Sequence, residues 1–82
     1  IDLVMRDHDQ VAFIEVRCRG RSRFGNATSS VTLKKQQKIV RCAQLFLQKF
    51  PKWAHHPCRF DVIAYDSGVS IGEPVWIRAA FQ

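Results

Sequence analysis

The chain lacks the long apolar segment that a membrane-spanning helix requires. None of its hydrophobic runs approaches the roughly 18 residues needed to cross a bilayer. Acidic residues are also scarce, with 7 Asp and Glu against 13 Lys and Arg, which gives a formal net charge of +6 and a pI near 9.8. A basic domain of this kind favours a polyanionic partner, with nucleic acid ahead of a membrane surface. We therefore expect DNA or RNA as the partner, and no membrane.

The chain also has no initiating methionine and too little length for two domains. Its 82 residues are enough for one small domain, and 46% hydrophobic residues are typical of a globular protein. No internal repeat is present. Ile1 already lies inside a predicted strand, so we expect further residues upstream. We predict a single domain over residues 1–82, in an N-terminally incomplete copy.

Cysteine is sparse and widely spaced. Cys18, Cys42 and Cys58 are an odd number, and two of them lie on apolar stripes. We therefore expect buried free thiols and a reducing, cytoplasmic location. His55 and His56 precede Cys58, but this spacing matches none of the usual paired zinc ligands, so we expect no zinc site.

The N-terminal stretch predicts a β-hairpin. Residues 1–6 and 11–18 are rich in strand formers, and the polar tetrad Asp-His-Asp-Gln at 7–10 is a turn signal. With a two- or four-residue loop, paired positions sum to 17, which places Asp2 opposite Glu15. A three- or five-residue loop would shift this register.

The two faces of this hairpin differ, because side chains alternate along a strand. The second face holds Asp2 and Glu15 beside the apolar pair Val4 and Phe13, so we expect it to be partly covered. The first face is entirely apolar and is expected to form the core: Ile1, Leu3, Met5, Ala12, Ile14, Val16 and Cys18.

Two carboxylates placed directly opposite each other destabilise a sheet, and desolvation raises the cost. A divalent cation such as Mg²⁺ or Mn²⁺ would remove the repulsion between Asp2 and Glu15, because these ions take hard oxygen ligands. The alternative is that both acids are solvated and paired with Arg6, Arg17 or Arg19. Both interpretations stay open on the pattern alone.

A basic loop follows the hairpin, with four arginines in residues 17–23 and then Gly, Asn and Ser. Such arginines could lie against phosphates, and Phe24 could stack on a base. The alternative is a solvated loop whose phenylalanine tucks under the core. The candidate nucleic-acid contacts in this loop are Arg19, Arg21, Arg23 and Phe24.

The sequence pattern of residues 32–50 predicts a helix. Thr32 is a suitable N-cap, and Pro51 ends the helix because the residue before proline disfavours helical geometry. Apolar residues recur at helical spacing on one face. This stripe consists of Ile39, Cys42, Ala43, Phe46, Leu47 and Phe50.

The first turn of this helix carries polar candidates. Extending the apolar stripe backwards reaches Lys35 and Gln36, so these residues are aimed partly toward the sheet and are candidate site residues. Lys34 and Lys38 point elsewhere and are candidate contacts for DNA phosphates. The alternative is an exposed first turn without a site.

The rest of the chain completes an α/β pattern. Residues 59–65 read as a strand, and strand, helix, strand implies a right-handed crossover, so this strand should run parallel to residues 11–18. Residues 75–81 end the chain as a short strand or a helical turn. The sequence thus predicts an α/β domain with a mixed sheet.

Several strings, in this order, resemble the YraN family of small bacterial proteins, and the resemblance covers nearly the whole chain. The resemblance implies a fold similar to restriction endonucleases and Holliday-junction resolvases, with an N-terminal helix and a first strand that are absent here. The strings are Ile-Asp-Leu (1–3), Phe-Ile-Glu-Val-Arg-Cys-Arg (13–19), Phe-Gly (24–25), Val-Thr (31–32), Lys-Gln (35–36) and Arg-Phe-Asp-Val-Ile (59–63).

The resemblance also implies a site. In nucleases of this fold, an Asp and then Glu-x-Lys on the next strand bind Mg²⁺, and these match Asp2 and Glu15. Arg17 stands where the pattern has Lys, and arginine is effectively never a neutral base. Arg17 is then expected to position water or phosphate, or Lys35 supplies the amine with Gln36 beside it.

The resulting prediction is a Mg²⁺- or Mn²⁺-dependent DNA endonuclease, with branched DNA among its candidate substrates. The alternative is a catalytically inactive nucleic-acid-binding module of the same fold, and a third reading is a protein that docks on an acidic partner. A resolvase would in addition need a homodimer.

Overall fold

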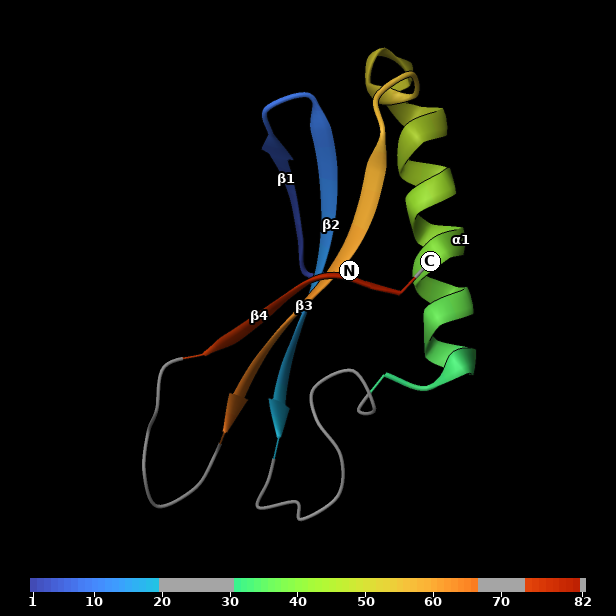
Figure 1. Ribbon diagram of the computed structural model, residues 1–82. Coiled ribbons are helices and arrows are strands. Elements are labelled where there is room, and N and C mark those ends of the chain that lie inside the picture. Colours follow the sequence, from blue (N-terminus) through green and yellow to red (C-terminus); the bar gives the residue numbers. More distant parts are fainter. Residues whose placement is uncertain (20–30, 67–73, 82) are drawn as a thin grey trace.

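The computed structural model describes residues 1–19, 31–66 and 74–81 (Figure 1). Within them, the strands form one mixed sheet in the order β1-β2-β3-β4. The elements are β1 (Leu3–Asp7), β2 (Gln10–Arg19), α1 (Leu33–Lys49), the 3₁₀ helix η2 (Pro51–Trp53), β3 (Cys58–Asp66) and β4 (Val75–Phe81). The α/β class is confirmed, and the mixed sheet with its flanking helix matches the restriction-endonuclease-like expectation.

The hairpin has the predicted register. β1 and β2 pair antiparallel with Leu3 opposite Ile14, so paired positions sum to 17. The loop is the two-residue version, His8-Asp9, and His8 takes a positive φ of 56°, as the first residue of a tight hairpin turn often does. The even loop length therefore sets which side chains of β1 and β2 share a face.

The crossover through α1 makes β3 parallel to β2, with Val11 opposite Cys58, as predicted. The C-terminal segment is a strand, which decides between the two alternatives for residues 75–81. β4 pairs antiparallel with β3, and the register shifts between Phe60 and Val62, where Ala79 takes a positive φ of 50°.

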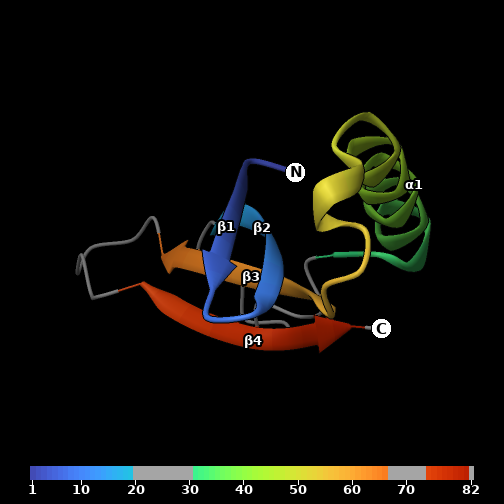
Figure 2. The ribbon, with the colours of Figure 1, turned by 90° about the horizontal axis from the view of Figure 1, so that it is seen from above.

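Helix α1 lies against one face of the sheet (Figure 2). Thr32 caps its first turn by accepting a hydrogen bond from the Lys35 amide (3.2 Å), and the helix ends before Pro51. The core beneath it is aromatic: the Phe13 ring stacks on Phe60 (5.6 Å) and meets Phe46 edge-on (5.7 Å). Packing of this helix face thus covers the side of the hairpin that carries Asp2 and Glu15.

The prediction for the opposite hairpin face is wrong in part. Ala12 and Ile14 are buried, and Ile1 is partly buried. The remaining members are exposed, because α1 covers the other face and no helix of the described residues lies over this one: Leu3, Met5, Val16 and Cys18.

The expectation of buried thiols is also wrong. Cys18, Cys42 and Cys58 are all exposed. Cys42 lies at the edge of the helix stripe, whose inward positions are Ile39 and Ala43. No helix in the described residues is long and apolar enough to cross a bilayer.

Candidate active site

Asp2, which precedes β1, is bonded to the two residues of β2 that flank Glu15. The backbone amide of Asp2 donates to the carbonyl of Ile14 (2.9 Å), which continues the ladder one residue beyond β1. In return, the Asp2 carboxylate accepts from the amide of Val16 (2.8 Å). The Asp2 side chain is therefore fixed against β2 at the level of Glu15, although it is exposed to solvent.

Glu15 is a buried carboxylate, with only 7% of its side chain exposed. Its Oε1 atom has no hydrogen-bond partner in the part of the chain that the structure describes. Charge compensates for this burial. Oε1 lies 3.3 Å from the Ile1 amino group, and Oε2 lies 3.6 Å from Lys35 Nζ and 3.8 Å from Arg17 Nη1. A buried carboxylate is costly unless it is paired, and these cations are the partners that the described residues offer it.

The first turn of α1 supplies one member of this cluster. Lys35 reaches Glu15 from a position about twenty residues later in the chain, because Thr32 starts the helix beside the sheet. Gln36 does something different, since its Nε2 donates to the carbonyl of Val31 (3.1 Å) and so holds the segment that enters the helix. The structure thus brings Lys35 to Glu15, whereas Asp2 bonds the backbone of Val16 and Gln36 bonds the backbone of Val31.

The donor set fits a hard divalent cation. Among the residues that the structure describes, no group of three or more His, Cys, Asp and Glu side chains is placed to hold a metal ion, so an ion at this site would have at most the two carboxylates of Asp2 and Glu15. Mg²⁺ is commonly bound by only one or two carboxylates, with water and substrate phosphates completing its octahedron. The unbonded Oε1 of Glu15 is the acceptor that such an ion would use.

Of the predicted nucleic-acid contacts, Lys34 and Lys38 lie exposed on α1. The others fall outside what the structure describes: the side chain of Arg19, and Arg21, Arg23 and Phe24 altogether. Arg17 is partly exposed and pairs with Glu15, so it stands between the carboxylate and solvent.

A second buried carboxylate, on the opposite face of the sheet, was not predicted from the sequence. Asp61 is 1% exposed. It accepts hydrogen bonds from Arg59 Nε (3.1 Å to each oxygen), Trp76 Nε1 (3.0 Å) and the amide of Ala79 (3.0 Å). Both oxygens are therefore bonded, and the bulge in β4 is held to β3. The sequence did contain a signal for this cluster: Arg59 and Asp61 are two positions apart on one strand, so their side chains lie on the same face of the sheet.

Arg59 links this cluster to the hairpin turn. Its Nη1 donates to Asp7 (2.8 Å) and to Gln10 (2.7 Å). The guanidinium lowers the pKa of the Asp7 carboxyl, and the adjacent His8 ring adds to this effect. Hydrogen bonds to Asp7 and Asp61 in turn raise the pKa of Arg59. This network ties β3 to the hairpin turn on the face opposite Glu15.

Comparison with known proteins places the chain in a family. The profile of the Uncharacterised protein family UPF0102 matches residues 1–65. This chain belongs to that family. UPF0102 is the YraN family, so the resemblance found in the sequence is confirmed.

Its relatives have the same family name. The chain is 54% identical over 83 residues to a UPF0102 protein of Pseudomonas savastanoi pv. phaseolicola and 50% identical over 82 residues to one of Stutzerimonas stutzeri. In both comparisons the match covers 100% of this chain and 68% of the relative.

Proposed function

We propose that this UPF0102 domain is a Mg²⁺-dependent DNA endonuclease with Asp2 and Glu15 as its metal ligands. The observation that carries the proposal is the state of Glu15: the carboxylate is buried and ion-paired, yet its Oε1 has no hydrogen-bond partner among the described residues. A buried acceptor without a hydrogen-bond partner calls for an explanation. Asp2, whose carboxylate is held on the amide of Val16 in the same strand, would supply the second oxygen ligand of a cation bound at Glu15.

Each group at this site has a role in the proposed reaction that follows from its chemistry. Bound Mg²⁺ would supply Lewis-acid polarisation of the phosphate and a hydroxide nucleophile at neutral pH. Lys35, 42% exposed, can turn from Glu15 toward a phosphate oxygen and stabilise the charge that develops there. Arg17, which pairs with Glu15, can bind a phosphate with its planar fork but cannot accept a proton.

DNA is the substrate that the charge supports. The net charge of +6 favours a polyanion, and the exposed Lys34 and Lys38 extend the positive surface of α1 beyond the carboxylate pair. Phosphate contacts of this kind position a backbone without reading its sequence. Binding should therefore weaken steeply as salt rises.

The test is cleavage of a labelled four-way junction and its matched linear duplex in Mg²⁺, Mn²⁺ or EDTA. Metal-dependent cuts that disappear in Glu15→Gln support the proposal, and junction over duplex preference would name the substrate class. Asp9→Asn is the matched control, since it removes one negative charge from the exposed turn and should leave cleavage unchanged. Cleavage that persists in Glu15→Gln would rule out this site.

A second candidate function is a nucleic-acid-binding module without catalysis. The side-chain cations at Glu15 favour it, because Arg17 and Lys35 can neutralise the carboxylate without a metal. This module predicts salt-sensitive DNA binding that is the same in EDTA and in Mg²⁺ and that survives Glu15→Gln. Arg17→Lys then separates the two: restored cleavage in this variant would show a catalytic site weakened only by its arginine.

A further inference from the structure

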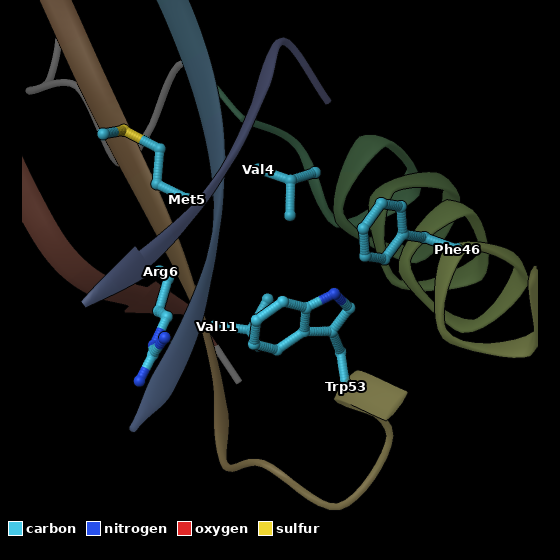
Figure 3. Close-up of a pocket in the computed structure, with 6 residues that line it drawn as sticks. All are labelled: Val4, Met5, Arg6, Val11, Phe46 and Trp53. Atoms are coloured by element: carbon cyan, nitrogen blue, oxygen red, sulfur yellow. The ribbon is translucent and has the colours of Figure 1, made fainter. Parts of the chain in front are cut away.

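An apolar pocket of about 290 Å³ opens between β1 and the C-terminal end of α1 (Figure 3). Figure 3 shows Val4 of β1, Phe46 of α1 and Trp53 of η2 pointing toward a common space. The remaining lining residues are Met5, Arg6 and Val11. The volume is close to the lower end of small-ligand sites, so it suits one planar ring system rather than a whole nucleotide.

The rim of this pocket is positively charged. Arg6 lies 5.9 Å from the centre of the Trp53 ring, and its Nε donates to the carbonyl of His8 (2.8 Å), which holds the side chain in place. Lys52 lies 5.2 Å from the same ring. Aromatic faces interleaved with cations are the arrangement that binds single-stranded nucleic acid, with bases on the rings and phosphates on the charges.

The pocket also lies on the face of β1 that carries the candidate active site. Asp2, Val4 and Arg6 alternate along this face. Val4 is therefore only about 7 Å from Asp2 along the strand, which is within the reach of one unstacked nucleotide.

We propose that this pocket takes up a single unpaired nucleobase of the DNA, with Trp53 as its stacking platform and Arg6 and Lys52 on the flanking phosphates. The inference rests on the proposed DNA substrate and names its class: DNA with an unpaired nucleotide next to the scissile phosphate. Charge complementarity selects this occupant over an apolar protein side chain, because the cationic rim would have no partner on an apolar peptide.

The test measures binding of the full chain in EDTA, where cleavage cannot interfere, by anisotropy of labelled DNA. The probes are a duplex, the same duplex with a single-nucleotide bulge, and the single strand. The wild-type protein should bind the bulged duplex about tenfold more tightly than the intact one, the effect expected of one stacked base. Quenching of tryptophan fluorescence by the bulged duplex should be reduced in Trp53→Phe.

Val4→Trp fills the pocket without removing a core residue, since Val4 is exposed on an edge strand. Leu3→Trp is the matched control, with the same new ring on the neighbouring position and the opposite face. Val4→Trp should abolish the preference for the bulge, and Leu3→Trp should retain it.

Three results would overturn the inference: no preference for the bulge, equal effects of the two tryptophan variants, or a change in sedimentation mass on Val4→Trp. The last would identify a second copy of the chain as the occupant. Cleavage of intact duplex without bulge preference would leave the proposed endonuclease standing while this inference fails. Bulge preference without metal-dependent cleavage would support this inference and contradict the proposed endonuclease.

Discussion

Two carboxylates are buried in neighbouring strands of the same sheet, and their surroundings differ. Asp61 is bonded at both oxygens by Arg59, Trp76 and the amide of Ala79. Glu15 has ion pairs at 3.3 to 3.8 Å and an oxygen without a hydrogen bond in the described residues. Asp61 belongs to the structure. Glu15 keeps one oxygen without a hydrogen-bond partner among the described residues, which is the feature on which its proposed role rests.

The comparison also shows how each strand face is used. Asp61 lies on the face away from α1 and fastens the bulge of β4, where a hydrogen-bonded network supports a local irregularity. Glu15 lies under the first turn of α1, where Lys35 and Arg17 are both partly exposed and can move to a ligand. Substitution of each carboxylate by its amide therefore tests the two assignments with the same chemical change.

The largest effect is expected for Asp61→Asn. Either orientation of the new amide places an NH₂ group against a donor, and the buried Arg59 loses the more deeply buried of its two charge partners and keeps only Asp7. Breaking a buried ion pair from one side costs about 3–5 kcal/mol, a large part of the stability of a domain this small. Urea unfolding followed by circular dichroism measures the loss. A destabilisation below about 1 kcal/mol would show that Asp61 is not the structural anchor.

Glu15→Gln should change the free energy of unfolding by about 1 kcal/mol or less, since Arg17 and Lys35 can return to water. The same urea experiment measures this change, and the prediction concerns the difference between the free energies of unfolding lost in Asp61→Asn and in Glu15→Gln. Equal destabilisation by the two substitutions would contradict the comparison. Loss of divalent-metal binding without loss of fold, seen by calorimetry, would strengthen it.

Asp7 should give the stability of the protein a dependence on acid pH. Arg59, and then His8, hold the pKa of the Asp7 carboxyl below its usual value of about 4 in the folded state. The folded-state pKa is lowered, so the stabilisation is complete above the unfolded pKa and disappears as pH falls through the folded one. Asp7→Asn should flatten the acid limb of a plot of unfolding midpoint against pH, and His8→Ala should flatten it less. An unchanged limb in Asp7→Asn would refute this assignment.

The smallest effect on stability is expected at the first turn of α1. Lys35→Met and Lys34→Met should each change the free energy of unfolding by less than about 1 kcal/mol, because Lys34 is exposed and Lys35 is partly exposed to water. Each removes one positive charge and should weaken DNA binding by a similar factor. Only Lys35→Met should also slow cleavage. Equal cleavage by the two variants would remove Lys35 from the site.

Much of the fold follows from local signals. An even loop at residues 7–10 sets the hairpin register, Thr32 and Pro51 bound the helix, and the crossover rule makes β3 parallel to β2. The predicted sum of 17 holds for every printed pair from Leu3–Ile14 to Asp7–Gln10, whereas the pairing of Asp2 with Glu15 as a site stays a prediction. Residue spacing along a strand or helix is enough for such predictions, because it depends only on backbone geometry.

The rest was decided by tertiary packing. Alternation along the hairpin separates two faces but does not say which one the helix covers, and so Leu3 and Met5 were expected inside and are exposed. Burial of Glu15 depends on where the first turn of α1 comes to rest, and the Asp61 network depends on a bulge in β4. The pocket at Trp53 likewise exists only where β1, α1 and η2 meet. The sequence determined the strands, the helix and their register, and only the packing of distant segments decided which side chains became core, site or pocket, because burial is set by contacts across the whole chain.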